Sequence, residues 1–351
     1  MAGIGGAPLD AKAALAKVVL GGTLTRDEAC RAMSTVLSGE ATPAQLGALL
    51  AALRVRGETV EEIAGFTLGM RQAALRVPDA EDAIDIVGTG GSRDDPFNIS
   101  TLASVVVAAA GPKVAKHGNR AASGKCGSAD ILEALGVRID LGPEGISHCL
   151  AEVGLAFMFA PRFHPSMRHA AQVRREIGIR TVFNILGPLA NPAGVRRAVI
   201  GVATPTLGGT VAQVLAELGM ERALVVHGSD GLDEITPAGP TRTWELRDGE
   251  VREGTIEPRM AGLETVSVAE IASGDAAANA AVARAVLGGQ RGPHRTVVVL
   301  NAAAACVVAG AAADLRAGVA LAERSIDSGS AAALLERFVG TTQRLGGEVA
   351  A

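Results

Sequence analysis

A loop rich in glycine and polar side chains spans residues 88–101 and reads GTGGSRDDPFNIST. Gly88, Gly90 and Gly91 follow the short apolar run DIV, which is typical of a strand. Bare glycine backbone lets a ligand approach closely and offers N–H groups to an anion. Asn98 and Ser100 then open the apolar helix LASVVVAAAG, and helix N-termini attract phosphate. The stretch predicts either a phosphate-binding loop or a tight strand-to-helix turn with an Asn/Ser cap.

A second loop, KVAKHGNRAASGKCGSAD at residues 113–130, also lies between a predicted strand and a predicted helix. It carries Lys113, Lys116, Arg120 and Lys125 among small residues, with no acidic residue before Asp130. Neither loop fits a known dinucleotide or P-loop spacing. A solvated surface loop usually mixes charges of both signs. Two strand-to-helix loops of this kind therefore indicate a ligand with more than one phosphate.

Acidic residues follow another predicted strand in the stretch RALVVHGSDGLDEIT. Asp230, Asp233 and Glu234 lie there. Mg²⁺ usually takes one or two carboxylates together with waters and substrate phosphates. The alternative is a solvated acidic turn. Beside two cationic or glycine-rich loops, the magnesium interpretation is favoured.

An arginine-rich helix begins the stretch HPSMRHAAQVRREIGIRTVFNILGPLANP, residues 164–192. An arginine fork such as that of Arg174 matches a carboxylate in a bidentate way, although a surface cation is the alternative. The chain has no GxSxG motif and no Cys set beside a His, and the lone His117 is more typical of a positioning role. Phosphate, metal and cation sites without a nucleophile predict electrostatic catalysis on a departing phosphate-type group.

The elements that position these loops differ along the chain. Residues 1 to about 75 predict a small helical bundle, because three capping boxes are followed by apolar stripes at helical spacing. The capping pairs are Thr25 with Glu28, Thr42 with Gln45, and Thr59 with Glu62.

After Pro78, strand-like runs alternate with helical stretches. The expected strands are DIVG, PKVAKHG, VRIDL, LAFMFA, RAVIGVA, RALVVHG and RTVVVLN. This alternation predicts an α/β fold, with a mostly parallel central sheet flanked by helices. Asp248-Gly249 in WELRDGEVREG predicts one antiparallel hairpin. Ligands of such sheets usually bind beyond the carboxyl ends of the strands, where all the loops above lie.

Composition limits the partners. The 351 residues carry a net charge of -4 and only 2% aromatic side chains, which argues against a nucleic-acid partner. The four cysteines form no CxxC pair, as expected in a reducing compartment. No long uncharged apolar run indicates a membrane span, and the N-terminal residues do not read as a secretion signal. We expect a cytoplasmic protein.

Four motifs in this order resemble the anthranilate phosphoribosyltransferase family: GTGG…NIST, KHGNRAAS…CGSAD, RREIGIRTVFNILGPLANP and DGLDE. The resemblance covers nearly the whole chain. It implies a nucleoside phosphorylase/phosphoribosyltransferase-like fold, with a smaller all-helical N-terminal domain at residues 1–75 and an α/β domain at residues 80–351. A segment near residues 162–185 would return to the helical domain, and a homodimer is expected.

The implied reaction transfers the phosphoribosyl group of phosphoribosyl pyrophosphate to the amine of anthranilate in tryptophan biosynthesis. The resemblance assigns anthranilate to Gly88, Asn119 and Arg174, and two Mg²⁺ ions to Ser100 and to Asp233 with Glu234. It assigns no nucleophile or general base. The residues implied to bind phosphoribosyl pyrophosphate are Gly88, Gly90, Gly91, Ser92, Asn98, Ile99, Ser100, Thr101, Lys116, His117, Gly118, Asn119, Arg120, Ala121, Ala122, Ser123, Gly124 and Ser128.

The first motif departs from the family pattern. Ser92 stands where an Asp is usual and Pro96 where a Thr is common, and we hypothesise that Asp94 or Asp95 replaces the missing carboxylate. Two alternatives to the transferase are kept: a nucleoside phosphorylase of the same fold, and a relative without activity that binds nucleic acid. Phosphorolysis of thymidine or uridine would favour the first, and salt-sensitive binding of single-stranded DNA the second.

Overall fold

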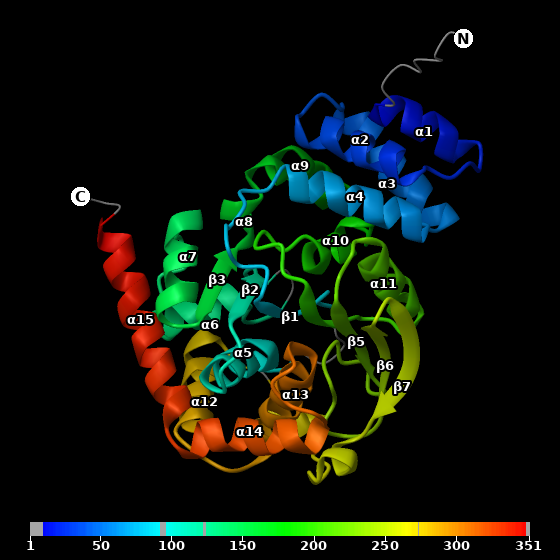
Figure 1. The fold of residues 1–351 in the computed structure, drawn as a ribbon. Coiled ribbons are helices and arrows are strands. Elements are labelled where there is room, and N and C mark those ends of the chain that lie inside the picture. Colours follow the sequence, from blue (N-terminus) through cyan, green and yellow to red (C-terminus); the bar gives the residue numbers. More distant parts are fainter. Residues whose placement is uncertain (1–9, 92–95, 122–123, 273, 349–351) are drawn as a thin grey trace.

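The computed structural model describes residues 10–91, 96–121, 124–272 and 274–348. Figure 1 shows a small group of helices above a larger α/β body. The small group contains α1 (Ala11–Val19), α2 (Arg26–Leu37), α3 (Pro43–Arg56) and α4 (Val60–Gln72). None of the described helices combines the length and the apolar character that crossing a bilayer would need.

All three expected capping boxes are present. The hydroxyls of Thr25, Thr42 and Thr59 each accept from the backbone N–H three residues later, and the side chain there accepts from the Thr N–H. Each such cap stabilises a helix by about 1 kcal/mol. The side chain of Glu62 is fully buried, and its carboxylate also pairs with the guanidinium of Arg56, which offsets the cost of burying the charge. This carboxylate therefore links the starts and ends of neighbouring helices in the bundle.

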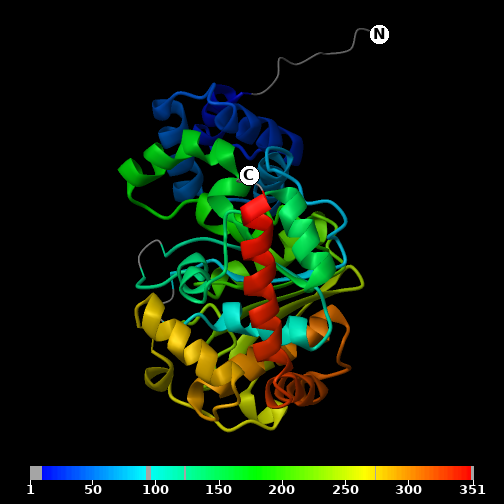
Figure 2. The ribbon, with the colours of Figure 1, turned by 90° about the vertical axis from the view of Figure 1, so that its left-hand side faces the viewer.

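The sheet of the larger body has the strand order β3-β2-β1-β4-β5-β6-β7 among the described residues. The first five strands in this order are parallel and the last two are antiparallel. Figure 2 shows the sheet from the side of its β3 edge, with the long last helix in front. The strands are β1 (Ile84–Gly88), β2 (Val114–Gly118), β3 (Leu155–Phe159), β4 (Arg197–Gly201), β5 (Arg222–Gly228), β6 (Thr241–Arg247) and β7 (Glu250–Ile256).

The expected hairpin between β6 and β7 is confirmed. Asp248 and Gly249 at its tip have φ angles of 53° and 79°, as a two-residue turn of the primed type requires. The five expected parallel strands DIVG, PKVAKHG, LAFMFA, RAVIGVA and RALVVHG are also present, with shifts of at most two residues at their ends.

Two expected strands were wrong. RTVVVLN lies inside α13 (Pro293–Ala309), a helix buried on most of its surface. A continuous apolar run fits a buried helix as well as a buried strand, and the helix start at Pro293 and the run of alanines after Asn301 decide for the helix. VRIDL alternates buried and exposed residues, but it pairs with no strand. Its Arg138 N–H instead donates to the Thr342 hydroxyl on the last helix.

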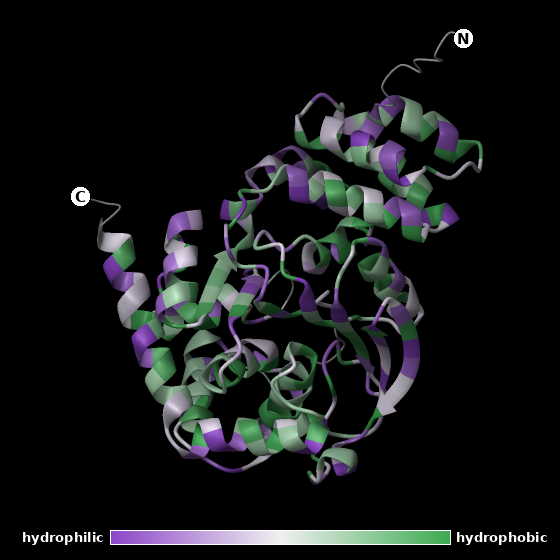
Figure 3. Cartoon of the chain, in the orientation of Figure 1, coloured by the Kyte–Doolittle hydropathy of each residue, from purple (hydrophilic) through white to green (hydrophobic). Residues whose placement is uncertain are grey.

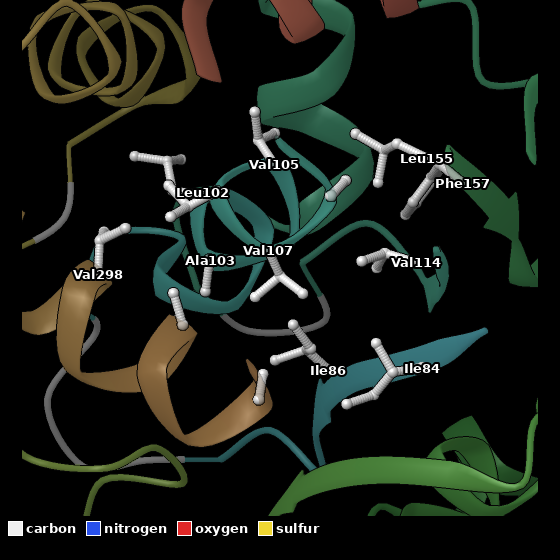
Figure 4. Close-up of a cluster of buried hydrophobic side chains, with 14 of the residues drawn as sticks. Ile84, Ile86, Leu102, Ala103, Val105, Val107, Val114, Leu155, Phe157 and Val298 are labelled. Atoms are coloured by element: carbon white, nitrogen blue, oxygen red, sulfur yellow. The ribbon is translucent and has the colours of Figure 1, made fainter. Parts of the chain in front are cut away.

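Helices cover both faces of the sheet. On one face, α5 (Ile99–Ala109) packs over β1 and β2 and α13 over β4, β5 and β1. Ile84, Ile86 and Val107 belong to one apolar cluster there (Figure 4). Both helices are mostly hydrophobic in Figure 3, whereas the peripheral helices carry hydrophilic outer faces. The remaining α/β helices are α6 (Ser128–Ala134), α7 (Pro143–Glu152), α8 (Ala160–Phe163), α11 (Thr206–Glu217), α12 (Ala276–Leu287), α14 (Leu315–Asp327) and α15 (Ser330–Glu348).

The other face of the sheet shares its apolar cluster with the N-terminal helices. Val173 on α9 (Arg168–Ile177) and Phe183 on α10 (Phe183–Leu189) belong to the same cluster as Leu46 and Leu50 of α3. Ile200 of β4 is also part of it. One continuous core thus joins the bundle to the sheet, and the domain boundaries at 1–75 and 80–351 stay predictions.

Candidate active site

A cavity of about 590 Å³ lies at the carboxyl ends of β1, β2 and β5. The loops after these three strands form its walls, as the parallel sheet predicts. Sixteen of the residues expected in the site line it: Gly88, Gly90, Gly91, Asn98, Ile99, Ser100, Lys116, His117, Gly118, Asn119, Arg120, Ala121, Gly124, Ser128, Asp233 and Glu234. The acids, the glycine loop and the second loop are therefore brought together.

The other expected residues lie elsewhere. Arg174 on α9 and the buried Thr101 on α5 do not line this cavity. Ser92, Ala122 and Ser123 lie outside the described residues, as do Arg93, Asp94 and Asp95. The hypothesis that Asp94 or Asp95 replaces the missing carboxylate therefore stays a hypothesis.

Asp233 closes the glycine loop from the opposite wall. Its Oδ2 atom accepts a hydrogen bond from the Gly90 N–H at 2.7 Å. A Cβ atom on Gly88 would lie 2.3 Å from the same oxygen, so any side chain there would displace the carboxylate. Gly90 has a φ angle of 68°, which L residues rarely adopt. The glycines are thus needed for the carboxylate to approach the loop.

The N-terminus of α5 already contacts an acidic side chain, that of Glu234. Both the hydroxyl and the backbone N–H of Ser100 donate to its carboxyl group, and such donors at a helix N-terminus suit acidic groups. Burial, and then the neighbouring Asp233, raise the pKa of Glu234. Burial and mutual repulsion thus disfavour two negative charges at this place. A divalent cation bound to the two carboxylates and the Ser100 hydroxyl would offset that repulsion.

Lys116 lies beneath this group rather than extending into solvent. Its Nζ atom is buried and donates to the Ile86 carbonyl and to the Ser100 Oγ atom at 3.2 Å. Burial lowers the pKa of Lys116, while Asp85 and Glu234 act in the opposite direction. Lys116 therefore links β1, β2 and the start of α5, and its charge partly balances that of the acids.

The second loop is held by Asp130. The Asp130 Oδ2 atom accepts from the Ala121 N–H at 3.1 Å and from the Gly127 N–H at 2.8 Å. Arg120 pairs with Asp130 at 2.9 Å and with Glu133. The loop has no acidic residue before Asp130, as the sequence shows, and Asp130 and Glu133 of the helix that it enters neutralise Arg120.

Asn98 joins the two loops. Its Nδ2 atom donates to the Cys126 carbonyl at 3.0 Å, and its Oδ1 atom accepts from Asn279 Nδ2 at 3.1 Å. Asn279 lies on α12, 181 positions further along the chain. No sequence motif indicated its participation.

His117 lines the cavity and lies beside a second buried imidazole, that of His164. The rings of His117 and His164 have centroids 5.1 Å apart. Burial lowers the pKa of His117 to about 3 and that of His164 to about 4. Both side chains are therefore neutral at pH 7. His117 Nδ1 lies 3.2 Å from the Gly187 carbonyl, and within the described residues the Nε2 atoms of both rings have no hydrogen-bond partner.

Arg174 stacks on an aromatic ring. Its Cζ atom lies 5.1 Å from the centroid of Phe183, a cation–π distance. Burial lowers its pKa, but a guanidinium stays charged at neutral pH. The contact with Phe183 thus restrains the orientation of the planar fork.

The sequence interpretation missed a buried polar pair beneath the site. The carboxylate of Asp85 on β1 accepts from the His117 N–H at 3.2 Å and from Asn191 Nδ2 at 2.7 Å. Burial raises the pKa of Asp85 to about 6. The available signal was an acidic residue inside an apolar strand, which is rarely tolerated without a partner.

The arrangement suits charge stabilisation rather than covalent catalysis. In the described part of the chain, no three His, Cys, Asp or Glu side chains gather into a metal-binding group. A cation at Asp233 and Glu234 would therefore need further oxygen ligands from phosphate or water, which is the preference of Mg²⁺. Helix N-terminus, glycine N–H groups and acids surround one space large enough for a phosphorylated sugar.

Comparisons with known proteins agree with this geometry. The helical bundle domain of the glycosyl transferase family matches residues 12–74, and the a/b domain of that family matches residues 80–332. The anthranilate phosphoribosyltransferase of Rhodopseudomonas palustris is 54% identical over 334 residues, which cover 95% of this chain and 99% of the relative.

Solved structures show the same similarity. The anthranilate phosphoribosyltransferase of Thermus thermophilus matches with a TM-score of 0.89 and 45% identity, over 94% of this chain and 99% of that chain. The Saccharomyces cerevisiae enzyme, solved in complex with phosphoribosyl pyrophosphate and Mg, matches with a TM-score of 0.87 and 28% identity, over 95% and 98% of the two chains. The yeast enzyme has also been solved with 4-fluoroanthranilate. The expected fold class is confirmed.

Proposed function

This chain belongs to the anthranilate phosphoribosyltransferase family, and we propose that the cavity beyond β1, β2 and β5 is where its two substrates meet. The protein transfers the phosphoribosyl group of phosphoribosyl pyrophosphate to the amine of anthranilate in tryptophan biosynthesis. The products are N-(5-phosphoribosyl)anthranilate and pyrophosphate. The observation that carries the assignment to this cavity is the contact of Asp233 with the glycine loop.

Phosphoribosyl pyrophosphate is assigned to the glycine loop, the start of α5 and the second loop. Support comes from the left-handed glycines, the helix N-terminus at Ser100 and the small residues near Gly118, all lining one cavity. Backbone N–H groups that point into such a space stabilise phosphate oxygens without a side-chain rearrangement. Lys116 contributes indirectly by fixing Ser100.

Magnesium is assigned to the acids, with two ions per site. Asp233 and Glu234 would hold one ion and Ser100 would contact the other. The bound cations would neutralise charge on the diphosphate as it departs. Support comes from Glu234, which accepts hydrogen bonds from Ser100, from the neighbouring carboxylate of Asp233, and from Mg in the yeast relative.

The chain contributes orientation and charge to the chemical step. The bond between C1 of the ribose and the pyrophosphate oxygen breaks, and C1 becomes oxocarbenium-like before the aromatic amine bonds to it from the opposite face. Each good donor to the developing charge lowers the barrier by about 3 kcal/mol. Arg174, Asn119 and Gly88 would meet anthranilate, with the guanidinium facing its carboxylate.

We further propose a homodimer and a cytoplasmic location. The dimer follows from the family resemblance. The location is supported by the cysteines of the described chain, which form no disulfide. The division into a helical domain at 1–75, the returning segment near 162–185 and an α/β domain at 80–351 is proposed with them.

One assay tests the function. Anthranilate fluorescence should fall on addition of phosphoribosyl pyrophosphate and Mg²⁺, and chelation with EDTA should stop the fall. Unchanged fluorescence together with phosphorolysis of thymidine or uridine would replace the transferase with a phosphorylase.

A further inference from the structure

Arg180 reaches the glycine loop from a segment whose contacts fix its position. Helix α9 ends at Ile177 and is followed by Gly178, whose φ angle of 66° terminates the helix. Immediately after Arg180, the Thr181 N–H donates to Asn184 Oδ1 at 2.9 Å, and Val182 and Phe183 are buried. The backbone at Arg180 is therefore anchored, whereas its side chain is exposed.

The guanidinium lies directly on the two central glycines. Its Nη2 atom donates to the Gly90 carbonyl at 3.3 Å. A Cβ atom on Gly91 would lie only 2.2 Å from Nη1, so the guanidinium occupies the space of the missing side chain. Since Asp233 holds the Gly90 N–H at 2.7 Å, the peptide groups on either side of Gly90 are fixed by side chains from two distant segments.

The surroundings of Arg180 differ from those of Arg120. Within the described residues no carboxylate lies at ion-pair distance from the Arg180 guanidinium, whereas Arg120 on the second loop pairs with Asp130 and Glu133. A guanidinium beside a loop of backbone N–H groups favours an anionic ligand. The adjacent Asp233 and Glu234 identify that end of the cavity as the one where a cation would bridge a diphosphate.

We propose that Arg180 is a positioning residue for the diphosphate end of phosphoribosyl pyrophosphate. It fixes the Gly90–Gly91 backbone beside the diphosphate, and it adds one positive charge there. This inference rests on the proposed function, because it names the part of the same site that recognises the leaving group.

The test compares Arg180→Ala with Arg175→Ala, which removes an equal charge from the exposed side of the same segment. Arg180→Ala should raise the KM for phosphoribosyl pyrophosphate and weaken binding of inorganic pyrophosphate with Mg²⁺ about tenfold or more, the scale of one lost charge-assisted hydrogen bond. The KM for anthranilate and the Tm should match those of Arg175→Ala. Arg180→Lys should recover only part of the loss, because an ammonium lacks the planar fork.

The inference is overturned if Arg180→Ala and Arg175→Ala bind pyrophosphate equally in calorimetry. It is also overturned if Arg180→Lys restores full affinity, because charge without orientation would then suffice. If Arg180→Ala fails to fold, Arg180→Gln takes its place in the same comparison. An inactive wild-type protein would contradict the proposed function instead, and the pyrophosphate titration would still decide the role of Arg180.

Discussion

The Gly90 N–H and the Asp233 carboxylate are hydrogen-bonded at 2.7 Å although 143 residues separate them in the chain. The parallel sheet makes this possible, because β1 and β5 end at the same edge with only β4 between them. Asp233, which we propose binds Mg²⁺, thus contacts the glycine loop, which we propose binds phosphate. Changes at either partner should therefore affect the same substrate.

Asp233→Asn keeps an acceptor for the Gly90 N–H but removes the charge. We expect turnover with Mg²⁺ to fall on the order of 100-fold, the cost of losing one good electrostatic group, with Tm nearly unchanged. Asp248→Asn at the exposed hairpin tip is the control, because asparagine tolerates its φ angle of 53°. Turnover equal to that of the control would remove Asp233 from the mechanism.

Gly91→Ala should impair use of phosphoribosyl pyrophosphate. Gly91 has a φ angle of 90°, and the added Cβ would meet the Arg180 guanidinium. Gly249→Ala is matched, since its φ angle is 79° and nothing lies within 4 Å. Both variants should lose about 1 kcal/mol of stability from backbone strain, but only Gly91→Ala should raise the KM. Equal kinetics for the two variants would contradict the close approach.

Arg174→Ala should mainly raise the KM for anthranilate. The stacked guanidinium offers a bidentate contact to a carboxylate, and losing it costs about 1.5–3 kcal/mol, or tenfold and more in affinity. Initial rates at saturating phosphoribosyl pyrophosphate measure the effect, and Arg175→Ala serves as the control. A change confined to the phosphoribosyl donor would disprove the assignment.

Glu62→Ala should unfold the helical bundle more readily than Glu28→Ala. Glu62 is fully buried and accepts from the Thr59 and Leu24 N–H groups, each at 2.8 Å, besides its ion pair with Arg56. Removing one partner of a buried pair costs about 3–5 kcal/mol, whereas the cap at Glu28 contributes about 1 kcal/mol. Urea denaturation followed by circular dichroism compares the two, and similar midpoints would contradict the role of burial.

The loops of the site were predictable because glycine, acid and cation follow strands in the sequence itself. Their partners were not. Asn279 contacts the site from a helix whose local sequence carries no motif. Arg180 and Asn191 lie within RREIGIRTVFNILGPLANP, but that motif did not indicate their contacts with Gly90 and Asp85. Only the tertiary fold brings these side chains near the site. The failure at RTVVVLN has a related cause, because burial on all sides removes the periodicity that separates helix from strand.

Acid should destabilise the protein through its buried imidazoles. The folded-state pKa values of His117 and His164, about 3 and about 4, lie below the unfolded value of about 6.5. The unfolded chain therefore binds protons first as pH falls, and stability present above pH 6.5 is lost below it. At pH 5.5 each imidazole should cost about 1.4 kcal/mol. Between pH 7.5 and pH 5.5, the urea midpoint of unfolding should therefore fall less in His117→Asn than in wild type. The exposed control His148→Asn should show the same fall of the urea midpoint as wild type. An equal fall in both variants would show that the buried imidazoles are not the cause.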